Sequence, residues 1–394
     1  MQINRDILGK LIEDLSAKYI TILVGARQVG KTHLLKRVQE FAKRKGLKTT
    51  FFDLEQPADL AQFNAPDKEV LNLLSQSGDV VFIDEFHYLK NASKLLKAIY
   101  DRGLPIKIFA SGSSSIEIHT HLKESLVGRK RIYHIPPCGV AEITQIVPDD
   151  PLSYFVTYGG MPETTHFEDP EQKKLLLAEI LQSYVLKDIK SLIREENLRA
   201  FNNLMYLLAQ FQGSTVAVAS LAREVGLTPR TVESHLELLA QTYVCFPLVS
   251  YSRNLGNELK KTKKYYLYDL GIRNALLKNF AKWTDRTDVG TILETFVFLA
   301  LHRRLSPESE LRFWRLKSGE EVDFIWIRNQ EPVPIEVKKT CRLGEIPTGL
   351  KAFLKRYPKT KGAYIVSSGT EGEAVFEGVP VTYLKVENVS EIVS

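Results

Sequence analysis

Short apolar runs alternate with helical stretches along the first 140 residues. Strand-length runs lie at 20–25, 49–54, 79–84 and 106–110, and the segment THLLKRVQEFAKR after the first run has apolar residues at helical spacing. Strands separated by helices are typical of a parallel sheet with crossover helices. We therefore expect an α/β core over residues 1–140.

From about residue 141 the strand pattern fades and helical spacing takes over, as in EQKKLLLAEILQSYVLKDIKSLI. We expect a helical lid over residues 141–212. In the next segment a helix ends near Gly226, Thr228 can cap a second helix, and Pro229 suits its first turn. Two strand-like runs follow, around 243–251 and 264–268. Two helices followed by a hairpin predict a winged helix over residues 213–280.

The last part of the chain returns to mixed structure. A helix is expected at 288–304, strands at 311–315, 322–327 and 333–337, a helix at 347–356 and a strand at 362–368. Residues 281–394 therefore form a small α/β unit. The expected fold class is α/β, with a P-loop parallel-sheet core, a helical lid, a winged helix and this C-terminal unit.

Composition places the protein among ordinary globular chains. Its 394 residues are 44% hydrophobic and 25% charged. Three cysteines, Cys138, Cys245 and Cys341, are too few and too scattered for a disulfide framework or a cysteine zinc site, so we expect a reducing cytoplasm. No apolar run approaches the 18 residues of a membrane span, and acidic residues stand where a signal peptide would be apolar. Membrane insertion and secretion are not expected.

The net charge of +6 lies almost entirely in one short segment. Residues 251–280 hold 7 basic and 2 acidic side chains, whereas the rest of the chain is nearly balanced. A local basic patch is a candidate footprint for nucleic acid, and an exposed, solvated hairpin is the alternative. The lysines that we expect to contact DNA are Lys260, Lys261, Lys263 and Lys264.

A phosphate-binding loop follows the first predicted strand. GARQVGKT matches the pattern G-x-x-x-x-G-K-[ST] between a strand and a helix. The glycines let backbone N–H groups approach phosphates, Lys31 can reach the β and γ oxygens, and the Thr32 hydroxyl can ligate Mg²⁺. The expected nucleotide-contacting residues are Gly25, Ala26, Arg27, Gln28, Val29, Gly30, Lys31, Thr32 and His33.

Two acids end the apolar strand VVFIDE. Asp84 can hold the Mg²⁺ shell and Glu85 can polarise the attacking water, although acids at a strand end are often only solvated. No guanine-reading signature accompanies the loop, so ATP with Mg²⁺ is expected.

Two further polar groups follow in the sequence. The strand IKIFA leads into SGSSS, where Ser111 or Ser113 can sense the γ-phosphate; the alternative is a helix cap. We expect Ser113 at the nucleotide. Arg129, in GRKR, can supply charge to the transition state in its own or a neighbouring subunit, and the alternative is a surface salt bridge.

Carboxylates recur in the C-terminal unit. Glu294 lies on a helix, Asp323 in one strand, and Glu336 and Lys338 alternate on one face of another. A hairpin would bring Asp323 beside Glu336. Three carboxylates suit Mg²⁺, and Lys338 could orient water for phosphodiester attack. The region has no basic bed for a phosphate backbone, so cleavage and a silent fold are both compatible with these residues.

The order of motifs resembles a known group. GARQVGKT, VVFIDEFHYL, SGSSS with LVGRKR, YGGMPE, EVDFIW and PIEVK resemble predicted AAA+-related ATPases of archaea and bacteria that carry a winged helix and a C-terminal domain similar to PD-(D/E)XK nucleases. The resemblance spans almost the whole chain. It implies an AAA+-type core with Lys31, Thr32, Asp84 and Glu85 in the roles above, and it suggests Arg129 as the arginine to test.

These observations predict an ATP-hydrolysing AAA+-like protein that acts on DNA, with a metal-dependent nuclease as an additional activity if the C-terminal carboxylates bind Mg²⁺. The rival interpretation is a nucleotide-controlled switch or scaffold that binds a protein partner and cuts nothing. Winged helices serve both purposes, and assembly into homo-oligomers is compatible with either.

Overall fold

The computed structural model describes residues 3–89, 92–113, 128–183, 193, 195–252 and 263–393. The chain folds as two compact units. The first comprises residues 1–146, 161–166 and 241–244, and the second comprises the remaining residues. Most of the expected lid and winged helix and all of the expected C-terminal unit lie in the second unit, whereas residues 141–146, 161–166 and 241–244 belong to the first.

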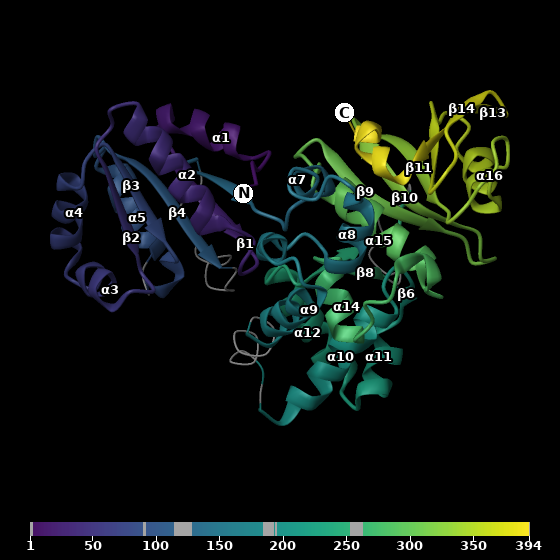
Figure 1. Ribbon diagram of the computed structural model, residues 1–394, viewed down its shortest axis with the longest axis horizontal. Coiled ribbons are helices and arrows are strands. Elements are labelled where there is room, and N and C mark those ends of the chain that lie inside the picture. Colours follow the sequence, from purple (N-terminus) through teal and green to yellow (C-terminus); the bar gives the residue numbers. More distant parts are fainter. Residues whose placement is uncertain are drawn as a thin grey trace. The chain divides into compact units, whose positions relative to one another are not determined.

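The first unit is built on a five-stranded parallel sheet with the order β2-β3-β4-β1-β5. Its strands are β1 (Ile20–Gly25), β2 (Thr49–Asp53), β3 (Val80–Asp84), β4 (Lys107–Ser113) and β5 (Lys130–His134). Its main helices are α1 (Leu8–Glu13), α2 (Lys31–Arg44), α3 (Pro57–Phe63), α4 (Asp67–Gln76), α5 (Ala92–Asp101) and α7 (Val140–Ile143) (Figure 1). The alternation of strands and helices agrees with the sequence pattern.

Apolar side chains from strands and helices form the core of this unit. Ile22 and Ile83 from the sheet pack in one buried cluster with Leu74 of α4 and Leu96 of α5. Strands β1 and β3 are buried along their whole length, and because the sheet is parallel their carboxyl ends lie at the same edge. That edge carries the P-loop and the two acids.

The second unit opens with helices and a small antiparallel sheet. The helices are α8 (Pro151–Tyr158), α9 (Pro170–Ile180), α10 (Leu198–Gln210), α11 (Val218–Val225), α12 (Pro229–Gln241) and α14 (Leu270–Leu277). The sheet has the order β6-β8-β7, with β6 (Thr215–Val216), β7 (Cys245–Leu248) and β8 (Lys263–Leu267). Gly226 is left-handed and ends α11, and the Thr228 hydroxyl accepts from the Thr231 N–H at the start of α12, as the sequence predicts.

A six-stranded mixed sheet completes the second unit, in the order β13-β14-β12-β11-β10-β9. Its strands are β9 (Ser309–Arg315), β10 (Glu321–Arg328), β11 (Glu331–Val337), β12 (Ala363–Ser367), β13 (Gly372–Phe376) and β14 (Val379–Lys385). Helices α15 (Val289–His302) and α16 (Thr348–Arg356) pack against it. Ile325 and Ile365 of the sheet meet Leu350 and Phe353 of α16 in one apolar cluster.

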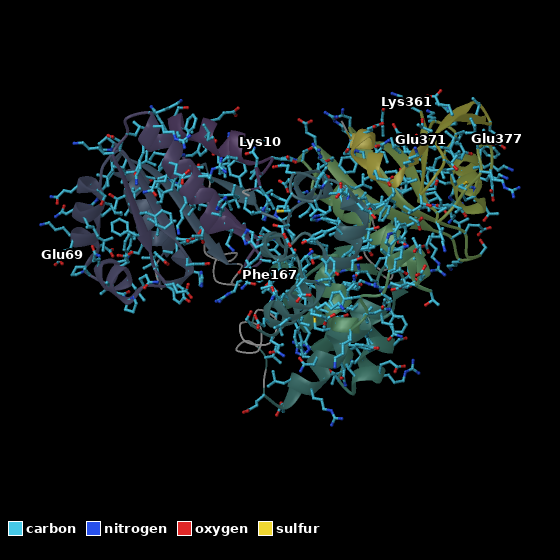
Figure 2. All side chains as sticks on the ribbon, in the orientation of Figure 1. Lys10, Glu69, Phe167, Lys361, Glu371 and Glu377 are labelled. Atoms are coloured by element: carbon cyan, nitrogen blue, oxygen red, sulfur yellow. The ribbon has the colours of Figure 1, made fainter. Side chains whose placement is uncertain are left out.

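Charged side chains cover the outer surfaces of both units. Lys10 and Glu69 in the first unit and Lys361, Glu371 and Glu377 in the second are exposed and point away from the ribbon (Figure 2). In the part of the chain that the structure describes, no helix is long and apolar enough to cross a membrane.

Candidate functional site

The P-loop joins β1 to α2 through unusual backbone conformations. Gly30 has φ +93° and Gln28 has φ 60°, both in the left-handed region. A Cβ on Gly25 would collide with the carbonyl oxygen of Ile135. The loop therefore turns tightly into the N-terminus of α2, and the first N–H groups of a helix favour phosphate binding.

Lys31 is the cation of this loop. Its side chain is buried, and its Nζ donates to the carbonyl oxygens of Gly25 at 3.1 Å and Ala26 at 2.8 Å. Burial lowers the pKa of Lys31, while the nearby Glu85 and Asp84 act against that shift. A phosphate at the loop would offer this buried ammonium stronger acceptors than two neutral carbonyls.

Asp84, Thr32 and Ser111 meet beside the loop. Asp84 ends β3 and is buried; burial raises its pKa, while hydrogen bonds from Ser111 and Thr32 oppose the rise. The Ser111 Oγ contacts the Asp84 carboxylate directly. The Thr32 hydroxyl and the Asp84 carboxylate are hard oxygen donors of the kind that Mg²⁺ prefers, and they lie together at the edge of the loop.

Glu85 has a left-handed backbone conformation, and its side chain contacts His87. Its φ of 51° is left-handed, and its Oε2 lies 3.0 Å from Nδ1 of His87. The side chain is 20% exposed, so solvent water reaches the carboxylate. Backbone strain of this kind gathers at functional positions.

The structure separates the two serines that the sequence offered as sensors. Ser111 is buried against Asp84, whereas the backbone of Ser113 lies beside Gly25 in the register of β4 and β1. His33 is partly buried in the first turn of α2, and burial together with Arg37 lowers its pKa.

Sequence reasoning missed a buried arginine behind the loop. Arg5 donates to the Val29 carbonyl at 2.8 Å and to the Pro136 carbonyl at 2.7 Å, and its Nε pairs with Glu142 at 3.1 Å. Arg5 and Glu142 are 5% and 1% exposed. This pair ties the N-terminal segment, the P-loop and α7 together. Nothing in its spacing marks it, because the residues are 137 positions apart.

Arg129 lies far from the nucleotide edge of its own sheet. Its carbonyl accepts from the N–H of Ile20, which begins β1, while the P-loop follows the other end of that strand. At 3.3 Å per residue, β1 separates the two by roughly 17 Å. The guanidinium pairs with Asp101 at 2.6 Å and lies over the Tyr100 ring. Its own P-loop is therefore out of reach.

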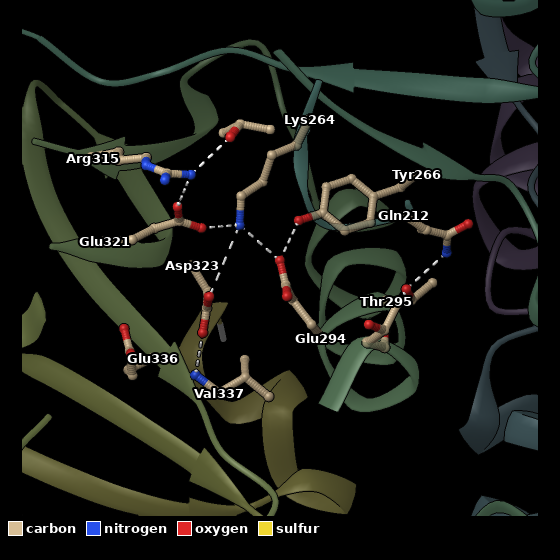
Figure 3. A network of polar contacts seen from close by, with 12 residues as sticks. Gln212, Lys264, Tyr266, Glu294, Thr295, Arg315, Glu321, Asp323, Glu336 and Val337 are labelled. Atoms are coloured by element: carbon tan, nitrogen blue, oxygen red, sulfur yellow. Dashed lines mark hydrogen bonds and ion pairs between the residues drawn. The ribbon is translucent and has the colours of Figure 1, made fainter. Parts of the chain in front are cut away.

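The C-terminal carboxylates gather around a lysine (Figure 3). Lys264 of β8 has its Nζ 2.9 Å from Glu294, 2.6 Å from Glu321 and 4.0 Å from Asp323. The Tyr266 hydroxyl donates to the same Glu294 at 2.6 Å. Burial raises the pKa of Glu294 and outweighs the opposing effect of Lys264.

Glu336 lies on the other side of Asp323. Its Oε1 pairs with Lys338 at 2.6 Å, and its Oε2 is buried without a hydrogen-bond partner. Burial and the nearby Asp323 raise the pKa of Glu336. Asp323 accepts from the Val337 N–H at 2.8 Å. Strands β10 and β11 pair as the expected hairpin, which brings Asp323 beside Glu336. Asp323, Glu336 and Lys338 line a pocket of about 380 Å³.

This centre does not fit a divalent cation as it stands. One oxygen of Glu294 and one of Glu321 are already engaged by the Lys264 ammonium. Among the described residues, no three His, Cys, Asp or Glu side chains are gathered so that they could hold a metal ion. The structure therefore gives no support for a metal on Glu294, Asp323 and Glu336, which the sequence had suggested.

The basic segment is only partly described. Lys260 and Lys261 lie outside the described residues. Lys263 is exposed, but Lys264 is fully buried, which corrects its expected position on an open wing. Successive residues of a strand point to opposite faces, so two adjacent lysines of β8 cannot both face solvent here.

The exposed face of α12 is more acidic than basic. Arg230, Ser234, Glu233 and Glu237 are exposed, whereas His235 is buried against Phe201. Two carboxylates on this face oppose close approach of a phosphate backbone.

Three family models match successive parts of the chain. Residues 17–144 match the family described as "AAA domain", residues 150–282 match a domain of unknown function (DUF8612), and residues 289–385 match another (DUF4143). Residues 17–144 of the first unit are thus similar to AAA domains, and the fold is α/β with a separate C-terminal mixed sheet.

Relatives resemble the chain over most of its length. An uncharacterized protein of Methanocaldococcus jannaschii is 27% identical over 402 residues, covering 96% of this chain and 87% of the relative. One of Mycobacterium tuberculosis is 24% identical over 340 residues, covering 86% and 74%. Among solved structures, AMPPCP-bound DnaA from Aquifex aeolicus aligns with a TM-score of 0.32 and 13% identity, covering 60% of this chain and 86% of that chain.

Proposed function

We propose that the chain hydrolyses ATP in its AAA-type unit and uses the cycle to control the engagement of DNA by its second unit. The observation that carries ATP hydrolysis is the convergence of Lys31, Thr32, Asp84 and Glu85 at one sheet edge.

Each residue has a distinct task in this proposal. Lys31 leaves the carbonyls of Gly25 and Ala26 and donates to the β and γ oxygens of ATP. Thr32 and Asp84 hold Mg²⁺, which when bound neutralises charge that develops on the phosphates. Glu85, held by His87, orients the attacking water and accepts its proton.

Negative charge on the phosphoryl group in the transition state can be stabilised by an additional cation, often an arginine. Arg129 is too far from its own P-loop, so a contribution from Arg129 requires a neighbouring copy of the chain. Its present pairing with Asp101 equally supports the salt-bridge alternative. Mixing Arg129→Ala with Lys31→Ala protein tests this: recovery of ATPase activity supports a shared site.

Engagement of DNA rests on the second unit. Helices α11 and α12 followed by the β7–β8 hairpin have the order of a winged helix, and residues 251–280 hold nearly all of the net charge. Lys263 is exposed at the start of β8. These features support contact through phosphates rather than base edges.

The second candidate function is a nucleotide-controlled switch that binds a protein and cuts nothing. Two observations favour it: the acidic exposed face of α12, and the lysine that engages the C-terminal carboxylates. The ATPase rate measured with and without duplex, single-stranded and branched DNA separates the candidates. Strong stimulation supports DNA, and an unchanged rate on every DNA supports the switch.

A further inference from the structure

The acidic centre of the C-terminal sheet contains its own cation. Lys264 comes from β8, while the carboxylates around it come from α15 and β10 (Figure 3). The Lys264 side chain is only 1% exposed. A buried ammonium is stabilised only when it is closely paired, and Nζ distances of 2.6 and 2.9 Å to two partly buried carboxylates meet that condition.

The position of Lys264 is fixed by its strand. Its backbone lies between Thr215 of β6 and Leu248 of β7 in the small sheet. Tyr266, two residues along β8, faces the same way and donates to the same Glu294 oxygen. Lys264 and Tyr266 thus lie on the same face of β8 and both donate to Glu294. Two donors from one strand indicate that the strand itself positions the contact.

The ammonium competes directly with a metal. A divalent cation such as Mg²⁺ needs carboxylate oxygens at about 2.1 Å, and the oxygens of Glu294 and Glu321 that face the centre already accept from Lys264. Arg315 engages the second oxygen of Glu321 at 3.2 Å. On the far side, Lys338 covers one oxygen of Glu336. The lysines therefore supply the positive charge that a metal would otherwise bring.

We propose that Lys264 is the resident cation of this centre, excludes divalent metal from it, and fastens strand β8 to the C-terminal sheet. Loss of the lysine charge releases Glu294 and Asp323, which can then shift toward Glu336, whose Oε2 is buried without a partner, and ligate a divalent cation with it. This inference goes beyond the proposed function and does not depend on it, because it concerns nucleotide-free protein.

Titration of the nucleotide-free full chain with Mn²⁺, followed by the electron paramagnetic resonance signal of free Mn²⁺, tests the proposal. Comparison of wild type with Asp323→Asn isolates the C-terminal centre from binding elsewhere. We expect the two proteins to bind Mn²⁺ identically. Tight binding by the wild type that is lost in Asp323→Asn would overturn the proposal, and this comparison does not depend on any Lys264 variant.

Lys264 variants then test the cause. Lys264→Met should gain one Mn²⁺ site with at least tenfold tighter binding than wild type at this centre, and Lys264→Met with Asp323→Asn should lose it. Lys264→Arg keeps the charge and should bind no extra Mn²⁺, and Lys263→Met is the matched control on the exposed neighbour. A folded Lys264→Met that gains no site contradicts the proposal. If Lys264→Met fails to fold, the Mn²⁺-induced change in melting temperature decides: the proposal requires the same change in wild type and in Asp323→Asn, and a rise that Asp323→Asn abolishes overturns it.

Discussion

At the scale of single residues, Lys31 and Glu85 are expected to fail in different ways. Lys31→Ala removes the buried cation and should abolish ATP binding. Glu85→Gln keeps the shape of the site but loses the base, so turnover should fall about 10²-fold or more with ATP affinity nearly kept. Equilibrium binding of a fluorescent ATP analogue and the steady-state ATPase rate measure the two effects.

A matched control for these changes lies on the same helix. Lys36→Ala alters an exposed lysine of α2 and should leave both measurements unchanged. Hydrolysis by Glu85→Gln at the wild-type rate would remove Glu85 from the role of base.

Arg5 should act on stability. Arg5→Met removes the cation that pairs with the buried Glu142 carboxylate, and breaking one side of a buried pair costs roughly 3–5 kcal/mol. We expect a lower melting temperature. The double variant Arg5→Met with Glu142→Gln should recover part of the loss, because it removes the uncompensated charge. Equal melting temperatures for wild type and Arg5→Met would show that the pair contributes nothing.

The residue scale also shows where sequence reasoning succeeds. The P-loop and Asp84 are local in sequence, so spacing alone places them. In the sequence, Lys264 cannot be distinguished from the other lysines of the basic segment. It is buried because side chains alternate along β8 and that of Lys264 falls on the face that packs against the C-terminal carboxylates. Arg5 and Glu142 meet through tertiary packing that no local pattern encodes.

At the scale of elements, the structure gives a packing role to Tyr158, Gly159 and Gly160, the first three residues of YGGMPE. Asp269 caps α14 by accepting from the Ile272 N–H at 3.0 Å, and its other oxygen accepts from the Gly160 N–H at 2.7 Å. A Cβ on Gly159 would collide with the Asp269 carboxylate, and one on Gly271 would collide with the Tyr158 carbonyl. The motif therefore lets α8 and α14 pack closely.

Gly271→Ala should force these two helices apart. The added methyl meets backbone rather than a movable side chain, so we expect a large fall in the melting temperature, in the range of overpacked sites that lose about 1–3 kcal/mol or more. Gly290→Ala, in a helix with open space around it, is the control and should be neutral or slightly stabilising. Similar melting temperatures for the two variants would contradict the packing argument.

Asp269 also gives a prediction on pH. Burial raises its pKa to about 6, while hydrogen bonds from Gly160, Ile272 and Gly271 oppose the rise. The folded state therefore holds this proton more tightly than the unfolded state, whose carboxyl titrates near 4. The stability contributed by the protonated group is present below about pH 4 and is lost as pH rises to about 6, on the order of 3 kcal/mol for two pKa units.

Thermal melts of wild type and Asp269→Asn from pH 4 to 7 measure this. Other titrating groups cancel in the difference between the two proteins. The stability of wild type minus that of the variant should fall between pH 4 and pH 6 and then level off. A difference that grows with pH would mean that the pKa is lowered, not raised.

At the scale of the whole molecule, the sequence predicts where helices and strands lie better than which strands are neighbours in a sheet. Alternating strands and helices predicted the α/β core, and the strands expected at 311–315, 322–327 and 333–337 correspond to β9, β10 and β11. The order β2-β3-β4-β1-β5 could not be predicted, because strand neighbours are set by packing across the sheet. Strands β13 and β14 were missed, since their segment is half exposed and interrupted by turns.

The last prediction concerns DNA binding by the whole chain. If phosphates are held by the basic segment, replacing Lys260, Lys261 and Lys263 with alanine should weaken binding to all sequences alike, because each phosphate contact releases condensed counterion. The slope of log affinity against log salt should become shallower by up to about 0.9 per lysine. Lys264 stays unchanged in this variant, because it is buried in the C-terminal centre.

Replacing the exposed Lys351, Lys355 and Lys359 removes the same charge elsewhere and should leave the slope nearly intact. Fluorescence anisotropy of labelled duplex DNA over a range of salt concentrations measures both slopes. Equal slopes in the two triple variants would mean that net charge alone attracts DNA and that the basic segment is not its binding site.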